Sequence, residues 1–204
     1  MNQGIRIREA SEDDTEDVAA VLRLAFAKYE PLYTVRAFAA TTPDAKGVAA
    51  RLREGPIWLA IHDETVVGTA GAICHSEQCY VRGVAVLPER RACGIASLLM
   101  ATVEHFAKET NVRRLFLTTT PFLHDAIRLY TRLGFERSSD GPHDLFGTPL
   151  LGMTKYLRVG GLTSHDVASG KNPKIEADRG LSGTNDDPTF KASGRYNHCG
   201  LGTI

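Results

Sequence analysis

The residues with the clearest chemical potential lie in one short loop, where two arginines and a glycine stand between an apolar strand and a helix. The sequence from Gly83 to Leu99 reads Gly-Val-Ala-Val-Leu-Pro-Glu-Arg-Arg-Ala-Cys-Gly-Ile-Ala-Ser-Leu-Leu. The first N–H groups of a helix have no partner within it, and the helix dipole places positive potential at the same end. Gly94 has no Cβ, so the backbone there can approach an anion closely. We therefore predict that this loop holds the pyrophosphate of a cofactor.

The elements that must position this loop can be predicted from the spacing of apolar residues. Glycines 68 and 71 inside one expected strand indicate a bulge or a close backbone approach. Three consecutive strands interrupt the alternation of strands and helices, which favours an α+β fold with a mixed sheet and helices on both faces over a doubly wound fold. The expected strands cover residues 5–8, 57–61, 66–74, 79–86, 115–120, 135 onward and 150–157, and the expected helices cover 11–26, 44–54, 95–108 and 123–133; the segment 32–40 is left unassigned.

Composition and charge argue against several classes of partner. The 204 residues include 24 basic and 24 acidic ones, so the sequence predicts no nucleic-acid partner. No apolar run reaches the ~20 residues of a membrane span, so no membrane partner is expected either. The first residues, Met-Asn-Gln-Gly-Ile-Arg, lack the apolar segment of a signal peptide, which predicts a soluble cytoplasmic protein.

The four cysteines, Cys74, Cys79, Cys93 and Cys199, have neither C-x-x-C nor metal-finger spacing. We therefore expect no metal site, and we expect buried reduced thiols rather than a disulfide where a cysteine lies in apolar or strand-like surroundings. The acidic cluster Glu12 to Glu16 is interpreted as the solvated first turn of a capped helix.

The composition changes near Val159. Residues 159–204 contain 8 of the 19 glycines, and their large apolar residues follow no period. The sequence therefore predicts one domain over residues 1–158 and a poorly ordered C-terminal extension over 159–204.

Two stretches together resemble the signatures of the GNAT N-acetyltransferase superfamily. The stretch from Val84 to Pro88, followed by Arg91-Ala92-Cys93-Gly94-Ile95-Ala96, is similar to the family's Arg/Gln-x-x-Gly-x-Gly/Ala acyl-CoA signature. The stretch from Ala126 to Phe135 resembles its second signature. The resemblance covers roughly residues 5–157 and implies a twisted, mostly antiparallel mixed sheet flanked by helices.

The resemblance also implies a cosubstrate and its binding residues. Acetyl-CoA would be the acyl donor, and no metal would be needed. Backbone N–H groups of the strand ending in Val86 would stabilise the tetrahedral oxyanion. The residues expected to bind acetyl-CoA are Val84, Ala85, Val86, Arg91, Ala92, Cys93, Gly94, Ile95, Ala96 and Ser97.

Tyr130 corresponds to the family's proton donor to the leaving CoA thiolate. Its helical spacing from Ala126 and Leu133 is equally compatible with a half-buried core residue. Cys93 is interpreted as a spacer in the loop, because direct transfer needs no acyl-enzyme.

The acceptor must also lose a proton. A lysine-like amine has a pKa of about 10.4, so deprotonation at pH 7 costs about 4.6 kcal/mol unless the site removes the proton. We assign Glu77 as the first candidate for the general base, with His75 as an alternative; either is also compatible with a surface turn residue. Family members that acetylate protein N-termini commonly place a glutamate where this chain has Thr118, which argues against such a substrate.

The function that these features favour is transfer of an acetyl group from acetyl-CoA to a primary amine of a small molecule. The alternatives are a non-catalytic acyl-CoA-binding regulatory module and a protein-modifying acetyltransferase. A homodimer is a further hypothesis. The sequence does not identify the amine.

Overall fold

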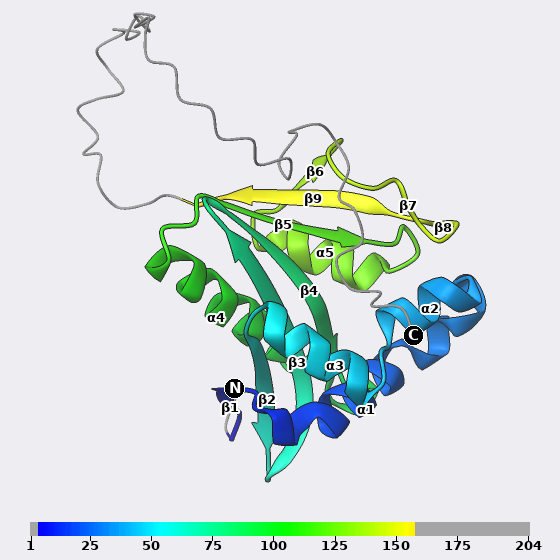
Figure 1. Ribbon diagram of the computed structural model, residues 1–204, viewed down its shortest axis with the longest axis vertical. Helices are drawn as coiled ribbons and strands as arrows, with labels where there is room; N and C mark the ends of the chain where they lie inside the picture. The colour runs from blue at the N-terminus through cyan, green and yellow to red at the C-terminus, as the bar shows by residue number, and fades with distance from the viewer. Residues whose placement is uncertain (1–3, 158–204) are drawn as a thin grey trace, which may run out of the picture.

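A seven-stranded sheet organises the protein, whose computed structural model describes residues 4–157 (Figure 1). The strand order is β1-β2-β3-β4-β5-β9-β6, and within the described residues only β4 and β5 pair in parallel. The predicted extension over 159–204, and Cys199 with it, lies outside the described residues. The strands of this sheet are β1 (Arg6–Glu9), β2 (Ile57–His62), β3 (Thr65–His75), β4 (Gln78–Val86), β5 (Arg114–Thr119), β6 (Glu136–Ser138) and β9 (Leu151–Tyr156).

Helices flank this sheet, which confirms the predicted α+β class. Residues 57–61 of β2 are buried in succession, so both faces of that strand are covered. Helix α1 packs against β3, β4 and α3, and α4 packs against β2, β3 and β4. No helix within residues 4–157 combines the length and apolarity needed to span a membrane. The helices are α1 (Thr15–Phe26), α2 (Val35–Thr41), α3 (Ala45–Glu54), α4 (Ile95–Glu109) and α5 (His124–Arg132), with 3-10 turns η1 (Glu12–Asp14), η2 (Ala27–Leu32) and η3 (Pro88–Arg90).

The segment without a sequence assignment contains α2. Its N-cap is Thr34, whose hydroxyl accepts a hydrogen bond from Ala37 N at 3.3 Å. The same hydroxyl donates to Phe146 O at 2.9 Å, and Thr34 N donates to Thr148 Oγ1 at 3.0 Å. These bonds join α2 to a small hairpin of β7 (Asp144–Leu145) and β8 (Thr148–Pro149), more than a hundred residues away along the chain. A contact of this range leaves no local sequence signal.

The parallel strands β4 and β5 separate part-way along their length. Their pairing runs from Gln78 opposite Arg114 to Val81 opposite Leu117 and then ends, although β4 continues to Val86. On its other side β4 pairs with β3, with Ala85 opposite Thr69 and Arg82 opposite Gly71. β4 therefore holds one residue more than β3 in this interval, which defines a β-bulge. The predicted irregularity therefore occurs beside Gly71 with the extra residue in β4. The glycine-containing β3 has a second one against β2, where Ala60 is opposite Gly68 and Ile61 is opposite Val66, so that Val67 is the extra residue.

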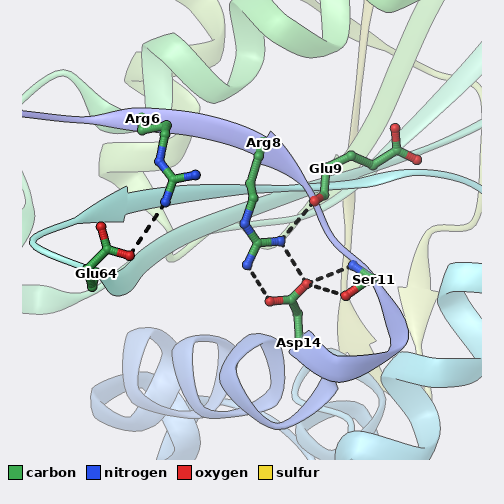
Figure 2. Close-up of polar contacts among 6 residues, drawn as sticks. All are labelled: Arg6, Arg8, Glu9, Ser11, Asp14 and Glu64. Carbon is green, nitrogen blue, oxygen red and sulfur yellow. Dashed lines mark hydrogen bonds and ion pairs between the residues drawn. The ribbon is translucent and has the colours of Figure 1, made fainter.

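Asp14 is buried and ion-paired, which corrects its interpretation as a solvated residue. Its carboxylate accepts hydrogen bonds from Arg8 Nη1 at 2.8 Å and Nη2 at 2.5 Å (Figure 2). Ser11 adds two more, from its backbone N at 2.7 Å and its hydroxyl at 2.9 Å. The Arg8 hydrogen bonds, followed by those of Ser11, hold the pKa of Asp14 well below its usual range, against the opposing effect of burial. The acidic turn thus attaches β1 to the start of α1.

Cys74 and Cys79 form a disulfide, so the expectation of reduced thiols was wrong for this pair. The two residues are directly opposite each other in the β3–β4 hairpin, with their Cα atoms 4.0 Å apart. Hairpin register, rather than the spacing of the two cysteines, brings them into contact. Cys93 is a free, exposed thiol.

Candidate active site

A cavity of about 710 Å³ opens where β4 and β5 separate. Residues 80–86 of β4, 117–119 of β5 and Thr120, directly after β5, line its walls. Residues 94–97 at the start of α4 close one end, and parts of η2, α2 and α3 border the other. Because β4 and β5 no longer pair beyond Val81 and Leu117, the backbone of residues 82–86 that faces the gap is available to a ligand.

The loop before α4 presents free backbone donors to this cavity. Gly94 is the N-cap of α4 with φ of 76°, and Ala92 also has a positive φ, of 61°. The first amide of α4 bonded to a preceding carbonyl is that of Leu98, which donates to Gly94 O at 3.1 Å. Among the described residues, the backbone N–H groups of residues 92–97 have no acceptor. Consecutive free N–H groups at left-handed positions are typical of a concave anion site, so binding of a pyrophosphate by this loop stays a prediction that this geometry favours.

The two arginines of this loop have different positions. Arg91 Nη2 donates to Ala25 O at 2.6 Å, near the C-terminal end of α1, and Arg91 N donates to Pro88 O at 3.3 Å. Arg91 therefore anchors the loop to α1, and its own N–H is already bonded. The side chain of Arg90 makes no hydrogen bond or ion pair among the described residues and lines the cavity. Cys93 lies in the same loop but does not line the cavity.

Tyr130 lines the cavity from α5, and only 6% of its surface is exposed. Its ring packs against Phe135, with centroids 5.9 Å apart. Burial raises the pKa of the Tyr130 hydroxyl well above its usual value, and the nearby Tyr80 and Tyr33 act in the same direction. The hydroxyl therefore stays protonated at neutral pH, as a proton donor must.

Glu77 and His75 are not brought to the cavity. Glu77 lies in the turn between β3 and β4, where its carboxylate forms an exposed ion pair with Arg113 Nε at 3.1 Å. His75 is the exposed last residue of β3. Both precede β4, whereas the cavity surrounds the later part of this strand. We therefore withdraw Glu77 and His75 as candidate bases.

Several cavity residues escaped the sequence analysis. Tyr29 and Tyr33 come from η2 and the residue after it, in the region without a clear period, and Arg51 comes from α3. Tyr80 lies in β4, and its hydroxyl is 3.0 Å from that of Thr118 in β5. Aromatic and threonine residues in strands are ordinary core residues, so only the separation of β4 from β5 marks this pair as cavity-facing.

The described residues include no group of three or more His, Cys, Asp or Glu side chains able to hold a metal ion.

The sequence of residues 17–135 matches the acetyltransferase (GNAT) family. The chain belongs to this family. The expected resemblance and the fold are thereby confirmed.

Individual relatives are similar over part of their length. The chain is 35% identical over 83 residues to a protein of Escherichia coli (strain K12) named "Uncharacterized N-acetyltransferase YjgM", covering 39% of this chain and 50% of that protein. It is 33% identical over 92 residues to N-acetyltransferase 8B of Rattus norvegicus, covering 42% and 41%. The chain thus spans half or less of the length of these curated relatives. The fold resembles a crystal structure of PaiA N-acetyltransferase from Thermoplasma acidophilum in complex with coenzyme A, with a TM-score of 0.64, 17% identity and coverage of 76% and 100%.

Proposed function

We propose that this GNAT protein transfers the acetyl group of acetyl-CoA to a primary amine of a small molecule. The observation that carries the proposal is the convergence, on one cavity, of the free amides of Ala92 and residues 94–97, the unpaired edge of β4 and the buried hydroxyl of Tyr130. The amides and Arg90 suit the pyrophosphate of CoA. The unpaired edge of β4 suits the amides of the CoA arm, with the thioester beside Val84, Ala85 and Val86.

The chemical step needs no acyl-enzyme. The neutral amine attacks the thioester carbonyl, a C–N bond forms, and the carbonyl oxygen becomes an oxyanion that backbone N–H groups of β4 can stabilise. The C–S bond then breaks with its electron pair on sulfur, and Tyr130 donates its proton to that thiolate. The proton lost by the amine returns through water to restore Tyr130.

Arginines explain how an amine can be neutral without a carboxylate base. Asp125 is the one carboxylate among the described lining residues, and it pairs with Arg128. Arg51 and Arg82 line the side of the cavity bordered by η2, α2 and α3, here called the acceptor side; Arg82 pairs with Glu54, whereas Arg51 has no ion-pair partner among the described residues. The positive charge of Arg51 disfavours an ammonium ion and lowers the pKa of a bound amine, so water can accept its proton.

A small acceptor is favoured by the elements around the cavity. Thr34 joins α2 to the β7–β8 hairpin, and both η2 and Leu145 of this hairpin line the cavity. The contact between α2 and the β7–β8 hairpin therefore borders the cavity on the acceptor side. A polypeptide substrate would need an open groove there. We therefore favour a small amine over a polypeptide.

The test is release of CoA thiol from acetyl-CoA in the presence of amines, amino acids and peptides, with acetylated product identified by mass. We expect release with at least one class of small amine. A protein that binds CoA in calorimetry but releases no thiol with any acceptor would instead be an acyl-CoA-binding regulatory module. Preference for peptides would favour the protein-modifying alternative.

A further inference from the structure

The acceptor side of the cavity contains two partly buried arginines whose charges are balanced differently. Arg82 of β4 pairs with Glu54, its Nη1 lying 2.5 Å from Glu54 Oε2. This contact is an ion pair without the alignment of a hydrogen bond. Arg82 Nη2 also donates to the backbone carbonyl of Arg51 at 3.1 Å. The charge of Arg82 is therefore compensated within the protein.

Arg51 has no such ion pair. Its Nη2 donates to Ala40 O at 2.6 Å, and no carboxylate of the described residues lies within ion-pair distance of it. Partial burial, and secondarily repulsion from Arg82, lower the pKa of the Arg51 guanidinium to about 10, although the more distant Glu54 acts in the opposite direction. Arg51 remains protonated at neutral pH, so the cavity contains a guanidinium that has no ion-pair partner among the described residues. A ligand that supplies an anion would give this partly buried charge a direct partner.

The position of Arg51 relates it to the reacting centre. Its Nη1 lies 3.8 Å from the point that a Cβ on Gly83 would occupy. Gly83 has φ of 61° and belongs to the bulge of β4, directly before the residues proposed to hold the thioester. An anion bound to Arg51 would therefore lie beside the acetyl group, on the side away from the loop at residues 91–97.

We propose that Arg51 binds the carboxylate of the acceptor, and that the acceptor is an amino acid or amino-acid derivative whose amine lies close to a free carboxylate. This inference rests on the proposed acetyl transfer and names the substrate class. The planar guanidinium matches the two oxygens of a carboxylate, and only one of its terminal nitrogens is already bonded to Ala40 O. Arg51 makes and breaks no covalent bond; it orients the amine toward the thioester.

The competing explanation is that Arg51 only joins α3 to α2 through Ala40 O. The two roles predict different effects on the ratio of kcat/KM for an acceptor with a carboxylate to kcat/KM for the matching acceptor without one. Loss of a structural role affects all acceptors alike and leaves this ratio unchanged, whereas loss of a carboxylate-binding role affects only acceptors with a carboxylate. We therefore compare amino acids with their amides and decarboxylated amines, for the wild type and for Arg51→Met. Arg53→Met is the matched control, because Arg53 is exposed on the same helix and does not line the cavity.

For responsive amino acids we expect the wild type to show a kcat/KM about 10- to 100-fold above that of the matching amide, the range of one charge-assisted contact. Arg51→Met should remove that preference and change kcat/KM for the amide less than about threefold, while Arg53→Met should keep the preference. The proposal is overturned if Arg51→Met keeps the wild-type ratio of kcat/KM for the acid to kcat/KM for the amide. It is also overturned if the wild type prefers amides, or phosphorylated amines such as phosphoethanolamine.

A binding experiment separates failure of this proposal from failure of acetyl transfer. Calorimetry with CoA present measures the affinity for an N-acetyl amino acid and for its amide, independently of turnover. Preferential binding of the acid by the wild type, lost in Arg51→Met, supports the carboxylate site even if no thiol is released. Equal binding of acid and amide overturns it even if acetylation proceeds. If Arg51→Met does not fold, Arg51→Lys and Arg51→Gln answer the same question, with lysine expected to retain more of the preference.

Discussion

Replacement of Tyr130 by phenylalanine tests the proposed proton donor with little structural disturbance. The ring remains, so the packing against Phe135 is preserved. The lost hydroxyl has no hydrogen-bond partner among the described residues, and therefore its removal leaves no donor or acceptor unsatisfied. We expect the free energy of unfolding to change by less than about 1 kcal/mol.

The expected effect on catalysis is much larger. A positioned general acid contributes roughly 10²- to 10⁴-fold to a rate. The Tyr80 hydroxyl also lines the cavity and can relay a proton through water, although it is already bonded to Thr118, so we place the loss toward the lower end. Tyr130→Phe should reduce kcat about 10²- to 10³-fold, or roughly 3–4 kcal/mol in the barrier. The affinity for CoA should stay within about threefold, because the phosphate-binding amides are unchanged.

The assay is steady-state thiol release with a responsive amine, combined with calorimetry of CoA binding and thermal unfolding. Tyr156→Phe, on an exposed side chain at the end of β9, is the matched control and should behave as wild type. Because burial raises the pKa of Tyr130, the donor stays protonated through neutral and mildly alkaline pH, so its titration should cause no loss of rate below about pH 10. A Tyr130→Phe enzyme that folds, binds CoA and turns over at the wild-type rate would refute the assignment.

Three further outcomes follow from the structure. Asp14→Asn should lower the free energy of unfolding by about 1–3 kcal/mol at pH 7 in chemical denaturation. Since the folded-state pKa of Asp14 is depressed, its contribution is complete above about pH 5 and should decrease progressively as the pH falls through about 4 toward the folded-state pKa; an equal loss at pH 2 and pH 7 would contradict this. Gly94→Val should weaken CoA binding at least about tenfold in calorimetry, because a branched residue resists the left-handed N-cap and crowds the anion site, and unchanged affinity would contradict that role. Without reductant, alkylation should modify Cys93 and leave Cys74 and Cys79 unmodified; alkylation of all three would show that the hairpin disulfide is absent.

The sequence predicted the parts of the site that depend on short-range rules. Gly94 before an apolar helix specifies a left-handed turn and free amides at a helix start, and both are local properties of the backbone. Tyr130 could likewise be placed on a helix by its spacing, and Gly134 ends that segment as expected, with φ of 85°. For these elements, the neighbours along the chain determine the structure.

Contacts between different elements of the fold decided the rest. Glu77 was a reasonable base from its residue type, but hairpin geometry places it in an exposed turn with Arg113. In the sequence Asp14 is one of several acids in a polar cluster, and only the position of β1 beside the start of α1 shows that Arg8 binds it. Cys74 and Cys79 meet only because β3 and β4 pair in one particular register.

The candidate acceptor site depends most strongly on tertiary structure. Arg51 is one of two arginines in helix α3, and its sequence context does not separate it from Arg53. Packing of α3 beside the bulged β4 places Arg51 near Gly83 and partly buries it, whereas Glu54 forms its ion pair with Arg82. The amides that suit the acyl donor belong to one continuous segment, so the sequence alone predicts them. The acceptor side combines η2 and α3 with β4, which lies about 30 residues further along the chain, and the apolar core packs α3 against β4 through residues such as Val48 and Val81.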